Sequence, residues 1–333
     1  MPKNKFSKIS SIIQDAKKGK MFILVDDKNR ENEGDLVIPG SKCNSKSINF
    51  MAKHGRGLIC LALTKKQVDN LKLPLMSPIN KSRMQTAFTI SIEAKKGVTT
   101  GISAHDRAKT IKTAINPKVK KNDIVSPGHV FPLVARNGGV LERAGHTEAS
   151  VDISKLSKLN PSSVICEVMN EDGRMARLND LFKFSKKHKI KLASIEDLIS
   201  YRFKNEKLIY KTALKSLSVS RIGKLNLHVY KNKLEKNINF AITKGKFNQI
   251  KSIPVRVLSS KIDGKNIIKI NKIKKSLKVM SKYKNFLLLI INNGNNIYKE
   301  NSINTLRYYG IGAQIIKDLN IRNMILISRS KKK

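Results

Sequence analysis

The stretch DDKNRENEGDLVIPG, residues 26–40, directly follows the apolar run MFILV of residues 21–25 and sets the pattern from which the fold is predicted. The apolar run has the length and composition of a short buried strand. Seven ionisable side chains then occur within ten positions. Charges at this density cannot all be buried, and like charges close together repel each other. The stretch is therefore either a solvated turn or a loop that is neutralised by a cation or a polar substrate.

The length of 333 residues is sufficient for two domains and a substantial hydrophobic core. The three cysteines, Cys43, Cys60 and Cys166, are widely spaced, and no cationic segment followed by an apolar one opens the chain. The longest apolar run, FLLLII at 286–291, has the length of a buried strand and is much shorter than a membrane span. We therefore expect a protein of the reducing cytoplasm that has no membrane segment.

The net charge of the chain is +43, from 67 Lys and Arg against 24 Asp and Glu. A charge this large is typical of proteins that bind nucleic acids. The lysines are scattered, however, and the aromatic residues that would stack on bases make up only 5% of the chain. We attribute the excess of Lys, Asn and Ile to a compositional bias of the genome. We expect no specific nucleic-acid partner, although the charge alone attracts polyanions at low salt.

Residues 1–205 alternate short apolar runs with amphipathic segments, which predicts an α+β domain with a mixed sheet whose loops carry the polar motifs. Apolar residues at helical spacing predict a helix over residues 9–16. Ser194 and Asp197 have the spacing of a capping box and predict the start of another helix. Strands are expected at 21–25, 57–63, 87–92 and 164–169.

A lysine-rich connection near residues 204–215 leads into a second region, for which a smaller α/β domain is expected over residues 216–330. Residues 206–333 hold 29 Lys and Arg but only five Asp and Glu, no cysteine and one histidine, His228. This region therefore lacks the usual residues of catalytic or metal sites. Its expected strands are 225–230, 254–258, and the two core strands 286–291 and 323–328; its expected helices are 273–283 and 303–319.

Five polar clusters in the first region are candidates to converge on one site. They are the charged loop with Arg30, Glu31, Glu33 and Asp35; TTGISAHDR at 99–107; SPGHVFPL at 126–133; RAGHTEAS at 143–150; and CEVMNEDG at 166–173. Each cluster is a weak signal by itself. Glu167, for example, lies in an otherwise apolar strand and faces either solvent or a pocket.

Taken together and in this order, the clusters closely resemble the 3,4-dihydroxy-2-butanone 4-phosphate synthase family from about residue 6 to residue 205. The segments that carry the resemblance are DDKNRENEGDL, HGRGLICLALT, TAFTISIEAKKGVTTGISAHDRAKTI, SPGHVFPLVARNGGVLERAGHTEASVDI and VICEVMNEDGRMAR. Enzymes of this family are lyases of riboflavin biosynthesis that convert ribulose 5-phosphate into 3,4-dihydroxy-2-butanone 4-phosphate and formate with Mg²⁺. The resemblance implies this activity, a sugar-phosphate substrate and a homodimer.

The resemblance also assigns roles to individual residues. The metal ligands of the family match Glu31 and His146, which would hold Mg²⁺ or Mn²⁺. The essential catalytic pair of the family matches His129 and Glu167. The substrate-binding positions match Arg30, Glu31, Asp35, Arg143, Ala144, Gly145, His146, Thr147 and Glu167, with Arg143 and Thr147 at the phosphate.

These residue types suit the reaction on chemical grounds as well. A pentulose phosphate that is enolised, dehydrated and rearranged needs a proton acceptor, a proton donor and a Lewis acid. Mg²⁺ prefers oxygen ligands and keeps several waters, so a site with few protein ligands is sufficient. Ser103 and Arg107 are further candidates for the phosphate site. Ser103 and Asp106 are explained equally well as the start of a helix, and both interpretations stay open.

The second region resembles GTP cyclohydrolase II, the usual fusion partner of the synthase, through PVRVLSSKIDG and TLRYYGIGAQIIKDLNIRNMILIS. The three-cysteine zinc cluster and the Arg- and Gly-rich catalytic segment of that family are absent. The resemblance therefore implies a degenerate, inactive domain without zinc. Two alternatives are a bifunctional enzyme that retains the cyclohydrolase activity, and a basic regulatory or nucleic-acid-binding module behind the synthase.

Overall fold

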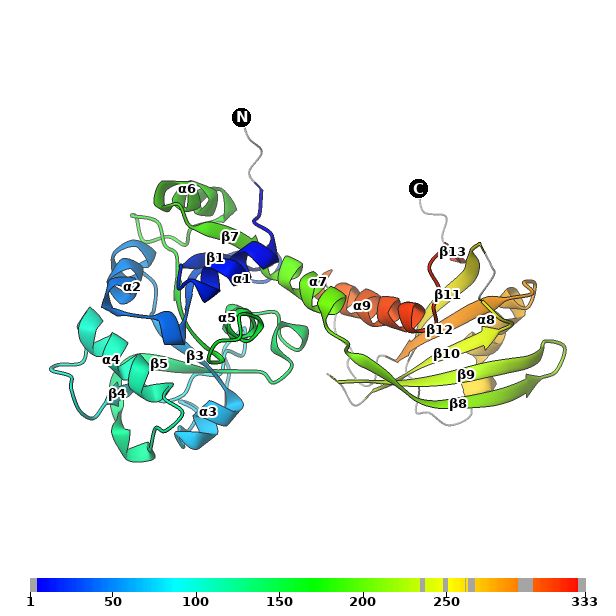
Figure 1. Cartoon of the computed structure of the whole chain (residues 1–333), viewed down its shortest axis with the longest axis horizontal. Coiled ribbons are helices and arrows are strands. Elements are labelled where there is room, and N and C mark those ends of the chain that lie inside the picture. The colour runs from blue at the N-terminus through cyan, green and yellow to red at the C-terminus, as the bar shows by residue number, and fades with distance from the viewer. Residues whose placement is uncertain are drawn as a thin grey trace. The chain divides into compact units, whose positions relative to one another are not determined.

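The computed structural model describes residues 5–233, 237–247, 251–260, 262, 267–292 and 302–328, with the backbone alone for residues 302–306. The chain divides into two compact units, Met1–Ile199 and Ser200–Lys333, and the boundary falls within helix α7, Ile195–Asn205 (Figure 1). Across the described ranges, no helix is both long enough and apolar enough to span a bilayer.

The first unit is built on a seven-stranded mixed sheet with the strand order β4-β5-β3-β6-β2-β1-β7. Its strands are β1 Phe22–Val25, β2 Gly34–Pro39, β3 Cys60–Thr64, β4 Ile92–Ala94, β5 Ile124–Ala135, β6 Ser162–Glu167 and β7 Lys191–Ser194. Its helices are α1 Ile9–Lys17, α2 Ser45–Phe50, α3 Lys65–Asn70, α4 Ala104–Ala114, α5 His146–Leu156, α6 Leu178–His188 and the first part of α7. The sheet contains both parallel and antiparallel strand pairs, which confirms the α+β prediction.

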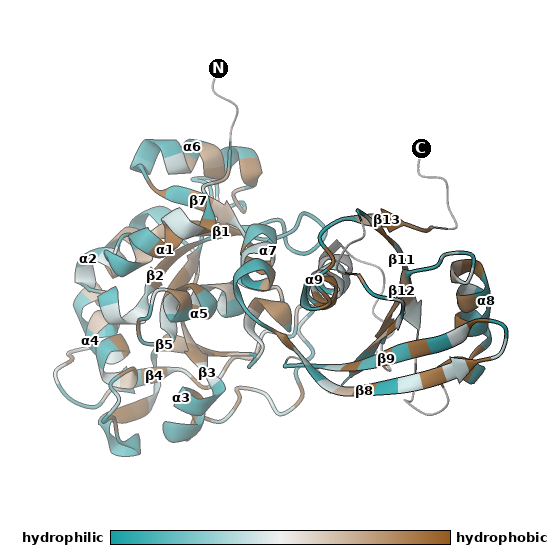
Figure 2. Cartoon of the chain, turned by 45° about the vertical axis from the view of Figure 1, so that its right-hand side comes forward, coloured by the Kyte–Doolittle hydropathy of each residue, from teal (hydrophilic) through white to brown (hydrophobic). Residues whose placement is uncertain are grey.

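The inner strands of this sheet are almost wholly buried, because most of their residues are apolar. All residues of β1 and β2 are buried, and Figure 2 shows the hydrophobic colours gathered on these strands. Helix α1 is confirmed where the apolar spacing predicts it, and it buries Ile9, Ile12 and Ile13. The Ser194 cap is also confirmed, since the amide of Asp197 donates to its Oγ at 3.0 Å.

The strand expected at residues 87–92 is wrong except for its last residue. Ile92 begins β4, whereas Phe88 and Thr89 form only isolated bridges, to Leu133 and Leu75. The amide of Thr89 donates to the carbonyl of Pro132 at 3.0 Å. Proline has no N–H to donate in return, so a regular ladder cannot continue at this point.

The second unit has a six-stranded sheet with the order β13-β11-β12-β10-β9-β8. Its strands are β8 Ile209–Val219, β9 Gly223–Asn232, β10 Ile238–Lys244, β11 Ile253–Ser260, β12 Phe286–Asn292 and β13 Met324–Leu326, and its helices are α8 Asn271–Met280 and α9 Ser302–Asp318. The predicted strand 286–291 is confirmed as β12, every residue of which is buried. The helices expected at 273–283 and 303–319 are confirmed as α8 and α9.

Two expectations for the second unit are wrong, and one strand was not predicted. The connection near residues 204–215 is largely strand β8, which pairs with β9 at the edge of the sheet. Most residues of β8 are exposed, so its lysines hide the alternation of apolar and polar residues that would identify a strand. Strand β10 is absent from the sequence-based prediction. The expected core strand at 323–328 is the short edge strand β13, whose three residues are each about half exposed, at 50 to 53%. An edge strand has no neighbour on one side, so a high apolar content does not by itself place it in the core.

Candidate active site

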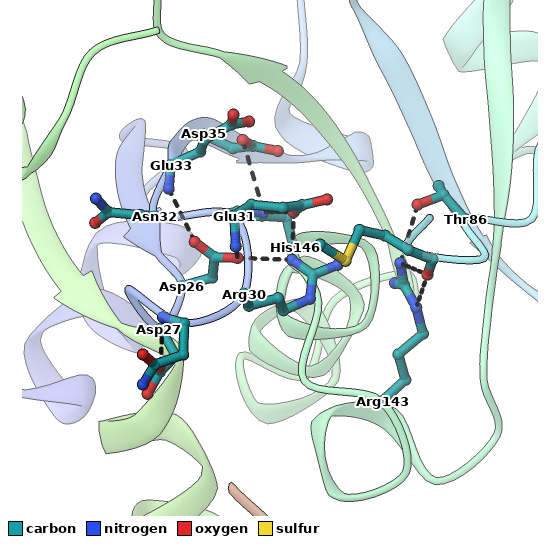
Figure 3. Close-up of polar contacts among 12 residues, drawn as sticks. Asp26, Asp27, Arg30, Glu31, Asn32, Glu33, Asp35, Thr86, Arg143 and His146 are labelled. Atoms are coloured by element: carbon teal, nitrogen blue, oxygen red, sulfur yellow. Dashed lines mark hydrogen bonds and ion pairs between the residues drawn. The ribbon is translucent and has the colours of Figure 1, made fainter. Parts of the chain in front are cut away.

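The charged stretch at residues 26–33 forms the loop of a hairpin between β1 and β2, and Asp26 organises it. The carboxylate of Asp26 accepts hydrogen bonds from the amides of Glu31 at 3.1 Å and Glu33 at 2.9 Å, and from Arg30 Nη1 at 2.8 Å (Figure 3). Its side chain is completely buried. Arg177 supports the loop from outside, because its Nη1 donates to the carbonyl of Glu31 at 2.7 Å. The stretch is therefore an ordered structure and not a solvated turn.

His146 lies at the first position of α5 and faces this loop. Its Nδ1 is 3.8 Å from Glu31 Oε2 and 3.8 Å from Asp35 Oδ1 (Figure 3). Burial lowers the pKa of His146, so the neutral imidazole, the form that binds metals, is favoured. Glu31 and His146, the two predicted metal ligands, are thus brought together.

A second group of carboxylates lies beside this pair. Asp35 in β2 pairs with Glu167 at the end of β6. Burial raises the pKa of Glu167, and burial together with the charge of Glu167 raises the pKa of Asp35 well above its usual range. The accumulated negative charge of this cluster disfavours the ionised forms, and a bound cation would relieve this repulsion.

The residues present fit a divalent cation. Asp26, Glu31 and His146 each offer a ligand atom, and the three atoms lie within 4.8 Å of one another. In the described part of the chain, Asp35 Oδ1 and His146 Nε2 are buried atoms without a hydrogen-bond partner. Oxygen-rich sets of this kind suit Mg²⁺ or Mn²⁺. Asp26 is a candidate ligand that the sequence-based analysis missed, although it belongs to the same acidic run.

Glu167 occupies a space that the HGRG motif leaves open. Its Oε2 accepts a hydrogen bond from the amide of Leu58 at 2.8 Å. A Cβ atom at Gly57 would lie 2.5 Å from the same oxygen, so only glycine fits there. Of the two interpretations of Glu167, the structure supports a half-buried position in a pocket over a solvated edge. Gly57 is a second position that the sequence-based analysis missed.

Arg143 and its neighbours lie at the start of α5, next to His146. Arg143 donates to Glu148 at 2.7 Å and to Thr86 at 2.9 Å, and twice to the carbonyl of Met84 (Figure 3). These four contacts use four of its five N–H groups. Thr147 is buried, and no side chain caps the helix, whose N-cap is Gly145. No side-chain cap therefore competes with an anion for the first amides of α5.

His129 is not in contact with Glu167 in this structure. It lies in β5, where its Nδ1 is 2.9 Å from Glu93 Oε2, and about two fifths of its side chain is exposed. Strand β3 lies between β5 and β6. Two strand spacings amount to about 9 to 10 Å, so a substrate, and not a direct contact, would connect the predicted pair.

Ser103 and Arg107 differ in their surroundings. Ser103 caps α4, since its Oγ accepts a hydrogen bond from the amide of Asp106 at 3.0 Å, as its structural interpretation predicts. Arg107 lies one turn further and is half buried, and burial lowers the pKa of its guanidinium. Its Nε has no hydrogen-bond partner in the residues that the structure describes.

Comparisons with known proteins give the relatives of this chain. The family model for 3,4-dihydroxy-2-butanone 4-phosphate synthase matches residues 10–201. The riboflavin biosynthesis protein RibBA of Aquifex aeolicus is 44% identical over 99% of this chain and 88% of its own length. The 3,4-dihydroxy-2-butanone 4-phosphate synthase of Photobacterium phosphoreum is 42% identical over 97% of this chain and 94% of its own length.

Two solved structures extend the comparison. RibBX of A. baumannii, a two-domain 3,4-dihydroxy-2-butanone 4-phosphate synthase, has a TM-score of 0.83 at 38% identity, over 98% of this chain and 95% of its own. A 3,4-dihydroxy-2-butanone 4-phosphate synthase in complex with two magnesium ions has a TM-score of 0.57 at 37% identity, over 60% of this chain and 98% of its own. The similarity to RibBX thus includes both units.

Proposed function

The chain belongs to the 3,4-dihydroxy-2-butanone 4-phosphate synthase family and is a synthase of riboflavin biosynthesis, and from this premise we propose how its residues carry the reaction. The substrate is D-ribulose 5-phosphate, and the products are L-3,4-dihydroxy-2-butanone 4-phosphate and formate. The observation that carries the proposal is the convergence of Asp26, Glu31 and His146 beside the buried Asp35 and its half-buried strand partner Glu167. Formate release from ribulose 5-phosphate by the purified chain with Mg²⁺ is the direct test.

The charged loop and His146 form the metal end of the site. Glu31 and His146 would hold the cation, Mg²⁺ or Mn²⁺, and Asp26 is the third candidate ligand. A cation bound there supplies Lewis acidity to adjacent oxygens of the sugar. Arg30 and Asp35 contact the sugar beside it, which places a guanidinium and a carboxyl group next to its hydroxyl groups.

Glu167 and His129 transfer protons in this proposal. Burial raises the pKa of Glu167, which makes its carboxylate a stronger base than an exposed one. The imidazole of His129 supplies a second proton acceptor from β5. Enolisation takes a proton from carbon, dehydration gives a proton to the hydroxyl that leaves as water, and the rearrangement takes a proton from a hydroxyl group, so two such groups on different strands are appropriate.

The start of α5 holds the phosphate in this proposal. The amides at its first turn and the hydroxyl of Thr147 offer hydrogen bonds to a dianion, and the helix dipole favours negative charge there. Arg143 donates to the phosphate through the one guanidinium N–H that its contacts within the protein leave free. Ala144 and Gly145 bring the backbone close, because neither has a long side chain.

The remaining assignments are proposals of the same kind. We assign the protein to the cytoplasm, as a homodimer without a specific nucleic-acid partner. We assign residues 1–205 to the synthase domain and residues 216–330 to a degenerate, inactive GTP cyclohydrolase II-like domain. His228 supports the second assignment, because it is buried and its Nε2 bonds to Thr243 Oγ1 at 3.0 Å.

We expect the full chain to bind no stoichiometric zinc and to show no GTP turnover above background. A catalytic zinc site needs about three protein ligands and an open position. The three cysteines, Cys43, Cys60 and Cys166, are buried in the first unit, and His228 is the only histidine after residue 205. Elemental analysis of the purified chain and a GTP-turnover assay check this. Stoichiometric zinc with a pyrimidine product would show that the second region is active.

Divalent cations should raise the melting temperature of the wild type, and Asp26→Asn should reduce this increase. A ligand at about one hundred times its Kd stabilises a protein by about 2.7 kcal/mol. The variant removes one charge from the cluster and weakens the loop that positions Glu31. Thermal unfolding with and without Mg²⁺ measures the effect, with Asp69→Asn as a control because Asp69 is an exposed carboxylate on α3. An undiminished increase in Asp26→Asn would exclude Asp26 from the cation site.

A further inference from the structure

We propose that Glu93 is a positioning residue that orients the imidazole of His129 and fixes its tautomer. This inference rests on the proposed role of His129 in proton transfer. The two side chains form a dyad, since Glu93 Oε2 is 2.9 Å from His129 Nδ1. The carboxylate side chain is the more protected member, with 15% of its surface exposed against 42% for the histidine.

The strands are shaped to form this contact. Ile92 in β4 pairs with Val130 in β5, but Glu93 pairs with Val125, so β5 bulges between the two pairs. His129 lies within the bulge. A bulge redirects side chains that would otherwise alternate regularly across the sheet. The amide of Gly128 donates to Ser91 Oγ at 3.1 Å and anchors the bulge beside His129.

Two glycines enclose the Glu93 side chain. A Cβ atom at Gly101, where φ is +85°, would lie 2.0 Å from Glu93 Oε1. A Cβ atom at Gly128 would lie 2.6 Å from Glu93 Cβ and 2.2 Å from the carbonyl carbon of Ile92. All three distances are too short for a Cβ atom, so both positions require glycine while β4 and the Glu93 side chain are in place.

The loop that carries Gly101 is itself held in place. Asp106 accepts hydrogen bonds from Thr99 Oγ1 at 2.8 Å and from the amide of Gly101 at 3.1 Å. Asp106 is buried, and these hydrogen bonds, that from Thr99 first, lower the pKa of its carboxyl group. The motif GVTTGISAHDR thus acquires a function: its loop encloses the carboxylate that contacts His129.

The chemical consequence concerns the nitrogen of His129 that does not touch Glu93. A carboxylate accepts a hydrogen bond and donates none, so it selects the tautomer with the proton on Nδ1. The lone pair is then on Nε2, at the opposite edge of the ring, where it can accept a proton from the substrate. The imidazolium that forms is stabilised by the adjacent negative charge, as in catalytic triads.

Steady-state kinetics of formate release from ribulose 5-phosphate tests this inference. Glu93→Gln keeps the shape of the side chain but loses its charge and can donate to Nδ1, which selects the wrong tautomer. We expect kcat to fall by roughly 10- to 1000-fold while KM changes by less than about threefold. Glu93→Asp, which keeps the charge on a shorter side chain, should recover part of the loss.

A double-variant cycle separates positioning from an independent role. Adding Glu93→Gln to His129→Ala should lower kcat no further, because residues that act as a unit are not additive. Glu196→Gln is the control, since Glu196 is exposed on α7, and melting temperatures verify folding. A kcat of Glu93→Gln within about twofold of the wild type, or multiplicative losses in the double variant, would overturn the inference. If His129→Ala alone retains full activity, the proposed role of His129 in proton transfer is wrong. If His129→Ala is inactive but Glu93→Gln is not, only the role of Glu93 is wrong.

Discussion

Replacing Glu31 by glutamine is expected to lower the rate of formate release by about 10³-fold or more. Its carboxylate lies 3.8 Å from His146 Nδ1 in the loop that Asp26 organises, and an amide is a poor ligand for a hard cation. A bound cation contributes several kcal/mol of transition-state stabilisation, and about 4 kcal/mol corresponds to this factor. His146→Ala should have an effect of similar size. Formate quantified over time under saturating Mg²⁺ measures both.

The matched control for this prediction lies in the same loop. Asp27 carries the same charge as Asp26, but its carboxylate accepts a hydrogen bond from the amide of Asn29 at 2.7 Å and lies away from His146 (Figure 3). Asp27→Asn should therefore retain activity. Chelation should silence the wild type, and added Mg²⁺ should restore it. Full activity in excess EDTA would refute the metal assignment.

Glu167→Gln is expected to lower kcat by about 10²- to 10⁴-fold with little change in KM. The carboxylate is fixed by the amide of Leu58 and partnered across the strands by Asp35, so the amide replacement fits the same space. The loss then reports proton transfer and not misfolding. His129→Ala should cause a loss in the same range, as the second member of the pair.

Circular dichroism and melting temperature provide the control for folding in both variants. Glu196→Gln on the exposed surface of α7 should match the wild type in kcat. A Glu167 or His129 variant with nearly normal turnover would remove that residue from the mechanism. A rise in KM with an unchanged kcat would instead assign the residue to substrate binding.

The sequence determines the elements that have a strong local pattern. The buried strands β1 and β12 and the amphipathic helix α1 are recognisable because their apolar residues have the length or the spacing of one type of element. The polar motifs around Glu31 and His146 are recognisable because they occur together and in order. Family membership therefore follows from short motifs, each of which is local in the chain, and the proposed site residues lie within these motifs.

The sequence does not determine the contacts that depend on pairing between distant segments. Strand β8 is mostly exposed, so only its pairing with β9 identifies it, and β13 is an edge strand despite its apolar composition. The same limit applies to the site. Neither the contact of Arg143 with Thr86 nor that of Glu93 with His129, 36 residues away, has a local signal.

The role of Asp26 shows the physical reason for this division. A run of charges gives no indication of which carboxylate is buried, because Asp and Glu carry the same chemical group and sequence position alone does not set its environment. The hairpin between β1 and β2 turns Asp26 inward, towards the amides of Glu31 and Glu33, and brings the loop against His146 from α5. Burial and the electrostatics that follow from it are properties of the assembled strands. Local sequence thus determined which chemical groups are available, and only the tertiary structure decided which of them meet.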